Sequence, residues 1–462
     1  MSDSSSDSGS RQMVSQPSSG RPRAWSLLSR PGSVAPWGAA AVLVVTISLA
    51  YWGKAVCLDG ETGFWGLNRY CYSDVRVLWS FRGFDVDAVP YTPPPPGYVS
   101  DYVTEYPPGL AFPAWLIGVL TETREGFFNL TALTFAAAAF VTLRRLDAAL
   151  VALGRSRWRL LGFALSPGLV LFGMQNWDLW AVVLVAGGLA AAATRRPYEA
   201  AMWFGLGAAV KWWPALLLMT LVVGPWRPMP PAGRERGTSW LRPWAGAADL
   251  RPAGLGVGVW AALQVPAVLI SPGGWWDSIG FHLRRQANLD STVSAIGSFG
   301  SRRFPSSFWS DWYAEVSTVV TLGLLLGGIA LVAWLLHRGR LEPANAALAL
   351  VALFLLTGKV FSPQFVVWLL PVAVLASVSW TPVLAVEATN ASVWFLYGPW
   401  MANASEPEWG GFLDASQGMS IVRTLAVAWL VAAALVGTRW QSVPRLPGVE
   451  QADEHHAETA DR

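Results

Sequence analysis

Two acidic side chains, Asp74 and Glu105, stand where polar loop sequence meets apolar sequence. Asp74 begins an aromatic amphipathic stretch ending at Phe81, whose spacing predicts a short helix lying on a membrane surface. Glu105 precedes Tyr-Pro-Pro-Gly, where the chain turns back into apolar sequence. A carboxylate at such a boundary meets both water and an amphiphilic substrate, and a positioned carboxylate can act as a general base. We interpret the other carboxylates of the same loop as solvated charges.

Two ionisable residues interrupt apolar runs further along the chain. Asp178 follows Asn-Trp at the start of a run, and Lys211 precedes Trp-Trp-Pro in the middle of another. A charged side chain at the centre of a bilayer costs about 2.5–3.5 kcal/mol, so each is expected to face a cavity or a partner. The sequence leaves two readings open, a structural Asp–Lys pair and contact with substrate.

Cationic residues gather in two later segments. His282, Arg284 and Arg285 lie in one predicted loop, and Lys359 precedes Ser-Pro-Gln364 at a predicted helix start. Guanidinium groups bind phosphate through paired hydrogen bonds, which makes these residues candidates for a phosphate site. A solvated amphipathic helix is the alternative for the arginines, and a local hydrogen bond is the alternative for His282.

The two cysteines, Cys57 and Cys71, share one predicted loop. In an oxidising compartment they are expected to form a disulfide, and a pair of free thiols is the alternative. We find no CxxC, HExxH or clustered Cys/His spacing, so we predict neither a metal site nor a cofactor.

The composition indicates which elements must position these groups. Hydrophobic residues make up 53% of the 462 residues and charged residues 14%, more apolar surface than one water-soluble core can hide. The predicted class is an all-α polytopic membrane protein. Runs near the spanning length of about 20 residues occur at 35–53, 126–143, 178–194, 315–336 and 420–438.

Arginine clusters predict which loops face the cytoplasm. They lie at Arg144 to Arg159, Arg195 and Arg196, Arg227 to Arg251, and Arg338 and Arg340. Since the clusters sit beside apolar runs rather than forming a basic stripe, we predict no nucleic-acid partner. The polar segments 54–106, 176–178, 271–312, 358–364 and 400–419 are then extracytoplasmic.

These assignments divide the chain into three parts. Residues 1–34 are predicted to be a disordered cytoplasmic tail and 441–462 a second cytoplasmic tail, on either side of a membrane domain at 35–440. Within that domain, 107–122 is expected to be re-entrant, while 198–226 is expected to be either two short helices or a hairpin broken near Lys211. The count is about ten to twelve crossings.

The motifs in this order resemble those of a known family. The resemblance rests on these motifs: Tyr72-Ser-Asp74, Glu105-Tyr-Pro-Pro-Gly109, Asn176-Trp-Asp178, Lys211-x-x-Pro214, His282-Leu-x-Arg285 and Phe361-Ser-Pro-Gln-Phe365. The pattern is similar to the actinobacterial polyprenyl-phosphate-mannose-dependent mannosyltransferases of the GT-C superfamily, family 87. This chain departs from the expected pattern at Arg284 and Asn288, where acidic residues are typical.

The resemblance implies a fold and a reaction. It implies a GT-C-type helical bundle in a bacterial plasma membrane, with its active site on the extracytoplasmic face. A hexose, mannose in the family, would pass from a polyprenyl-phosphate donor to a glycolipid or lipoglycan of the cell envelope. Asp74 would be the general base of an inverting displacement, with Glu105 as the second candidate.

Two other classes of function remain open from the sequence. A secondary transporter would also carry charges at depth and broken helices, although we find no matching broken segments in two halves of the chain. A non-catalytic membrane protein of envelope assembly is the other alternative.

Overall fold

The computed structural model describes residues 34–58, 69–93, 104–222, 249–403 and 410–436, and within them it contains helices and no strand. The two predicted tails and parts of the 54–106 loop lie outside the described residues. The α-helices are α1 (Val34–Ala55), α2 (Asp74–Phe81), α3 (Pro108–Val119), α4 (Arg124–Ala152), α5 (Leu161–Ala164), α6 (Pro167–Phe172), α7 (Asp178–Ala193), α8 (Pro197–Val210), α9 (Met219–Val222), α10 (Arg251–Ile270), α11 (Pro272–Arg284), α12 (Thr292–Arg303), α13 (Ser307–Asp311), α14 (Tyr313–His337), α15 (Pro343–Thr357), α16 (Leu369–Leu375), α17 (Trp380–Ala402) and α18 (Gly410–Val436). The 3₁₀ helices are η3 (Phe84–Val86), η4 (Arg157–Leu160), η5 (Trp213–Leu218) and η7 (Pro363–Trp368).

Five helices in the described part of the chain are long and apolar enough to cross a membrane, namely α1, α4, α10, α14 and α18. Shorter apolar helices accompany them, among them α3, α7 and α15. The protein is therefore an all-α polytopic membrane protein. The predicted count of about ten to twelve crossings stays a prediction, because it requires the shorter helices to cross as well.

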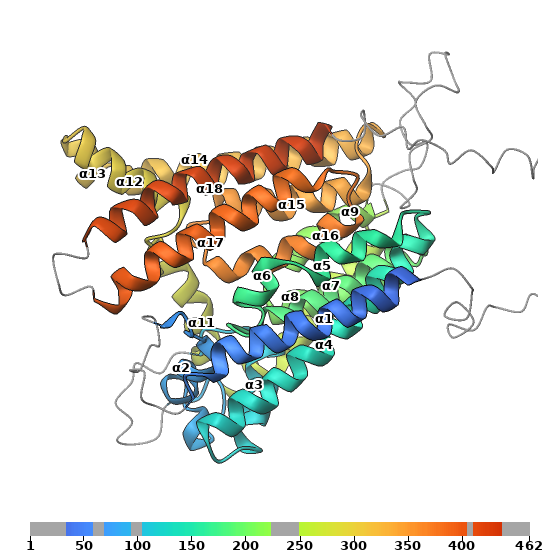
Figure 1. Cartoon of the computed structure of the whole chain (residues 1–462), viewed down its shortest axis with the longest axis horizontal. Coiled ribbons are helices and arrows are strands. Elements are labelled where there is room, and N and C mark those ends of the chain that lie inside the picture. Colours follow the sequence, from blue (N-terminus) through green and yellow to red (C-terminus); the bar gives the residue numbers. More distant parts are fainter. Residues whose placement is uncertain (1–33, 59–68, 94–103, 223–248, 404–409, 437–462) are drawn as a thin grey trace, which may run out of the picture.

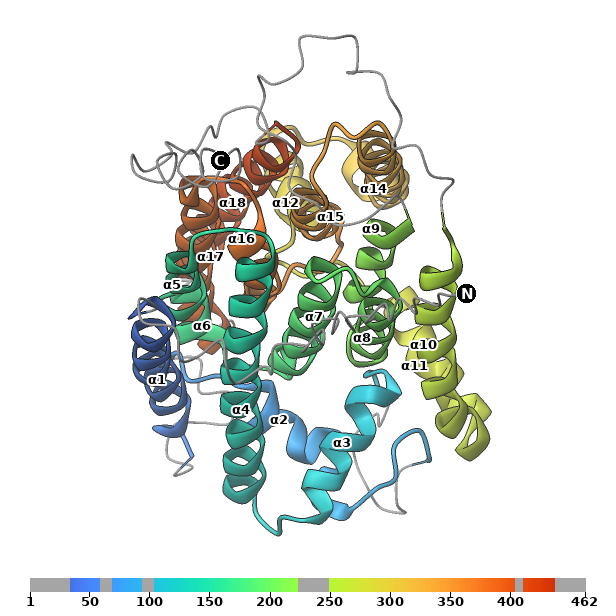
Figure 2. The same ribbon diagram turned by 90° about the vertical axis from the view of Figure 1, so that its right-hand side faces the viewer.

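The helices differ sharply in how much of their surface other helices cover. Nearly every residue of α7, α15 and α16 is buried, and Figure 2 shows α7 and α8 in the middle of the bundle. In the apolar stretch of α14, 11% of the residues are buried inside the protein. Most of the surface of this helix is therefore available to lipid. Ala and Gly fill much of α7, which lets neighbouring backbones approach closely.

The bundle has an arginine-rich end and an opposite end where the functional motifs meet. At the arginine-rich end Arg155 pairs with Glu342, and Arg157 pairs with Asp147 at 2.5 Å. Arg159 Nη2 donates to the carbonyl oxygen of Ala376 at 2.7 Å. The helices α2, α3 and α11 lie at the other end (Figure 1). The predicted cluster from Arg227 to Arg251 lies mostly outside the described residues.

The helix α3 is too short to cross a bilayer. Its 12 residues span about 18 Å at 1.5 Å per residue, against a hydrocarbon core of about 30 Å. It packs on α8 at Gly109, where an added Cβ would lie 2.6 Å from the carbonyl oxygen of Ala209. This close approach explains why glycine ends the Glu-Tyr-Pro-Pro-Gly motif, and it brings Glu105 and Tyr106 beside the end of α8.

The predicted break near Lys211 separates α8 from η5. Lys211 adopts an extended backbone (φ −144°, ψ 143°), and Pro214, which has no N–H to donate, lies in the first turn of η5. The chain then returns through η5 and α9. Lys211 therefore stands at the tip of a pair of short helices.

The helix α2 is not the free surface helix that its aromatic spacing predicts. Val75 is fully buried and Val77 nearly so, while Leu78 and Phe81 line a cavity. The reason is the anchoring of its first turn: the Asp74 N–H donates to the Gln175 carbonyl oxygen at 2.8 Å. Likewise, the predicted outer loops are partly helical, since 271–312 holds α11, α12 and α13, and 400–419 holds the end of α17 and the start of α18.

Cys57 and Cys71 are joined by a disulfide, with their Cα atoms 6.1 Å apart. The bond links the end of α1 to the segment that leads into α2. We expect the double substitution Cys57→Ser, Cys71→Ser to lower the free energy of unfolding by up to about 3 kcal/mol. The effect is limited because a disulfide that closes so short a ring removes little conformational entropy from the unfolded chain. Rapid alkylation followed by non-reducing mass mapping checks the bond, and two alkylated native cysteines would contradict it.

Candidate active site

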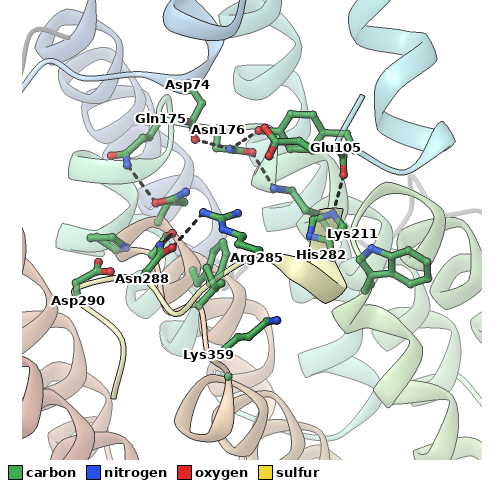
Figure 3. Close-up of a pocket in the computed structure, with 18 of the residues that line it drawn as sticks. Asp74, Glu105, Gln175, Asn176, Lys211, His282, Arg285, Asn288, Asp290 and Lys359 are labelled. Atoms are coloured by element: carbon green, nitrogen blue, oxygen red, sulfur yellow. Dashed lines mark hydrogen bonds between the residues drawn. The ribbon is translucent and has the colours of Figure 1, made fainter. Parts of the chain in front are cut away.

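A cavity of about 1130 Å³ opens at the end of the bundle where the motifs meet. Its walls come from α2, α11, the segment 285–290, the break after α8, the segment just before α7, and the start of η7. Figure 3 shows its polar side chains. The sequence-predicted residues that line it are Asp74, Glu105, Lys211, His282, Arg285, Lys359 and Gln364. Arg284 and Asp178, which were predicted with them, do not line it.

The carboxylate of Asp74 accepts a hydrogen bond on each oxygen. Tyr72 donates its hydroxyl to Oδ1 at 2.5 Å, and Asn176 donates Nδ2–H to Oδ2 at 2.5 Å. Burial raises the pKa of Asp74 above its ordinary value, and the two hydrogen bonds oppose this rise because they favour the ionised form. Asp74 is therefore a partly buried carboxylate with a fixed orientation and increased basicity, and it still faces the cavity.

Asn176 connects Asp74 to a buried ion pair. Its Oδ1 accepts a hydrogen bond from Lys211 Nζ at 2.8 Å, and Lys211 lies 3.3 Å from Asp178 Oδ1. Trp368 Nε1 also donates to Asp178 at 2.8 Å. The structure therefore contains the Asp178–Lys211 pair, the structural alternative in the sequence interpretation.

Glu105 differs from Asp74 in being tied to a cation. Its Oε1 lies 3.1 Å from Nη2 of Arg82, and its backbone carbonyl lies 2.7 Å from Nε2 of His282. A carbonyl oxygen can only accept, so His282 donates from Nε2. Burial lowers the pKa of His282, which favours its neutral form. Arg82 and His282 thus hold the 105–107 turn against the cavity wall.

Arg285 and Lys359 supply positive charge to the cavity wall opposite Asp74. Arg285 Nη2 donates to Asn288 Oδ1 at 3.1 Å, and Lys359 Nζ donates to the Leu283 carbonyl at 3.0 Å. Asn288 in turn donates to Ser362 Oγ at 3.1 Å, which joins the two segments. Each cation keeps further N–H donors with which a phosphate group can pair.

The two adjacent arginines have different environments because α11 ends between them. Arg284 is the last residue of α11, is exposed, and folds back toward Gly280 of its own helix. Arg285 leaves the helical path (φ −57°, ψ 130°) and faces the cavity. The solvated-helix alternative thus describes Arg284, and the cavity placement describes Arg285.

Stacked aromatic rings line the cavity beside η7. Trp368 stacks on Phe365 with ring centroids 4.0 Å apart and on Trp213 at 5.3 Å. Gln364, the second residue of this 3₁₀ helix, accepts a hydrogen bond from Gln175 Nε2 at 3.1 Å. Gln364 therefore bonds to the corner that carries Asn176.

Sequence reasoning assigned no role to several groups that the fold brings to Asp74 and Glu105. Tyr72 and Asn176 bind the Asp74 carboxylate, Tyr106 accepts from Asn176 at 3.1 Å, and Arg82 pairs with Glu105. Three of them stand inside the motifs that carry the family resemblance, so the signal was present. Arg82 stands outside those motifs.

The described residues contain no group of three His, Cys, Asp or Glu placed to hold a metal ion. The prediction that the protein uses no metal or cofactor is not tested by this and stays a prediction.

A comparison with family models decides the class of protein. The model of glycosyltransferase family 87 matches residues 104–363, more than half of the chain. The chain belongs to glycosyltransferase family 87. No curated protein matches it. The matched segment of this glycosyltransferase contains Glu105, Asp178, Lys211, His282 and Arg285, whereas Asp74 precedes it.

Proposed function

We propose that this family 87 glycosyltransferase moves a hexose, mannose in the first instance, from a polyprenyl-phosphate donor to a hydroxyl group of a cell-envelope glycolipid or lipoglycan. The reaction takes place on the extracytoplasmic face of the plasma membrane. One observation carries the proposal: a single cavity holds a partly buried carboxylate, Asp74, across from two cations, Arg285 and Lys359. That arrangement suits a donor phosphate at one wall and an acceptor hydroxyl at the other.

The reaction follows as a single displacement. The acceptor oxygen attacks the anomeric carbon while the bond from that carbon to the phosphate oxygen breaks, which inverts the anomeric configuration. The acceptor proton passes to Asp74, and polyprenyl phosphate leaves with the bonding electron pair. Arg285 and Lys359 stabilise the charge that develops on the leaving phosphate. Asp74 is the preferred base because Glu105 is already paired with Arg82.

The test is a transfer assay with purified protein. Polyprenyl-phosphate mannose, polyprenyl-phosphate glucose and a mannose nucleotide are each supplied with membrane lipid extract as acceptor. We expect transfer from a lipid-linked sugar and none from the nucleotide. Transfer from the nucleotide alone would overturn the donor assignment.

We also predict which end of the bundle faces the outside of the cell. Glu122, at the cavity end, and Arg338, at the arginine-rich end, are both exposed. We expect a membrane-impermeant thiol reagent to label Glu122→Cys in intact cells, and to label Arg338→Cys after lysis. Labelling of both before lysis would contradict the assignment of the cavity end to the outer face.

The raised pKa of Asp74 predicts the acid limb of the pH profile. A base must be ionised to accept a proton, so kcat/KM falls as pH drops through the pKa of Asp74. Because burial raises that pKa, the fall begins at a higher pH than for an ordinary aspartate. A profile of kcat/KM measured from about pH 4 to 9 checks this, and a flat acid side would speak against Asp74 as base.

A further inference from the structure

The amide of Asn176 stands between an anion and a cation, which determines its orientation. Lys211 Nζ has only N–H donors, so the atom of Asn176 that faces it at 2.8 Å must be the carbonyl oxygen. The Asp74 carboxylate can only accept, so the atom that faces it must be the amide nitrogen. Turning the amide over would create two repulsive contacts at once. Lys211 therefore points the N–H group of Asn176 at Asp74.

We infer that Asn176 is a positioning residue that keeps the Asp74 carboxylate ionised and oriented for the acceptor, and that Lys211 and Asp178 serve to fix Asn176. The inference rests on the proposed function, because it assigns roles around the proposed base. It also assigns Lys211 to the support of the base, and not to the direct contact with substrate that the sequence left open.

The contacts of Lys211 agree with this role. Its side chain is 12% exposed, and its ammonium group meets Asn176, Asp178 and the face of the Tyr106 ring, 5.2 Å from the ring centroid. Few directions remain from which a phosphate could approach. Asp178 outside the cavity balances the Lys211 charge, whereas Arg285 and Lys359 have no ion-pair partner among the described residues within salt-bridge distance.

Several charged or titratable groups act on Asp74 from the elements around it. They are Lys54 of α1, Tyr72 before α2, Glu105 and Tyr106 before α3, and Lys211 after α8. Burial raises the pKa of Tyr72 and of Tyr106 well above the ordinary value, so both stay protonated through the range in which Asp74 titrates. Asn176 and protonated Tyr72 are the two neutral donors to Asp74, and removal of the Asn176 amide changes no formal charge.

The experiment is the pH profile of kcat/KM for Asn176→Ala, with sugar transfer from polyprenyl phosphate as the assay. Loss of a hydrogen bond to the ionised carboxylate is expected to move the acid limb about one pH unit toward neutral. Gln175→Ala is the matched control, because its buried amide bonds to Gln364 and not to Asp74. Its acid limb is expected to stay at the wild-type pH, whatever happens to its turnover.

A second variant of equal side-chain volume tests the inference if Asn176→Ala does not fold. Asn176→Asp keeps the volume and can still accept from Lys211, but it places a second carboxylate beside Asp74, so its acid limb is expected to move in the same direction and further. An acid limb at the wild-type pH in a folded Asn176→Ala or Asn176→Asp protein overturns the inference. Wild-type protein that transfers no sugar from any polyprenyl phosphate overturns the proposed function instead.

Discussion

Replacing Asp74 by Asn is expected to lower turnover by about 10²–10⁴-fold while the protein stays folded. Asparagine keeps the volume of the side chain and can still accept from Tyr72 through its carbonyl oxygen, but it cannot take up the acceptor proton. The donor phosphate binds at the opposite wall, so donor binding should persist. Transfer of radiolabelled sugar by matched amounts of purified proteins measures the effect.

The loop offers a matched control for this substitution. Asp87 is exposed, lies outside the cavity, and has a positive φ of 52°, a conformation that asparagine accepts readily. We therefore expect Asp87→Asn to transfer sugar at the wild-type rate. Near-wild-type activity of Asp74→Asn would exclude Asp74 as the base and move the assignment to Glu105.

Replacing Arg285 by Gln is expected to lower kcat/KM for the lipid-linked donor by about 10²-fold. The guanidinium group faces the cavity and is anchored through Asn288, so its charge is in place before the phosphate arrives. Glutamine can still donate one hydrogen bond, but it cannot neutralise the charge on the leaving phosphate. Steady-state kinetics with varied donor and fixed acceptor give the loss.

Arg284 is the control for Arg285, because the two residues are adjacent and share a type but not an environment. Arg284 is exposed and folds against its own helix, so Arg284→Gln is expected to keep the wild-type kcat/KM. Equal losses in the two variants would mean that the positive charge of the segment matters and that the cavity geometry does not. An unchanged Arg285→Gln protein would remove the phosphate assignment.

The family and the class of fold could be predicted from the sequence because both depend on local patterns. Apolar runs of bilayer length identify a membrane protein whatever their mutual packing. The motifs from Glu105 to Phe365 identify the family in their linear order, and the family model matches 104–363. The break at Lys211 was also predictable, since a charge and a proline in an apolar run rarely continue a helix.

Which motif residues meet, and in what role, was decided by tertiary structure. The spacing of α2 predicts a surface helix, yet contacts of its first turn with the Gln175 corner bury Val75 and turn Leu78 toward the cavity. Neighbouring arginines are equivalent in sequence, but the end of α11 sends one outward and one inward.

The pairing around Asn176 shows the physical reason most directly. Asp74, Asn176 and Lys211 are far apart in the chain, and their hydrogen bonds form because the starts of α2 and α7 and the end of α8 converge at one end of the bundle. The sequence by itself determined that polar groups would lie at the membrane boundary, because a charged side chain inside the bilayer costs free energy whatever its partners. Long-range packing decided which of them bind one another, because the energy of a hydrogen bond depends on distances between groups that the sequence does not encode locally.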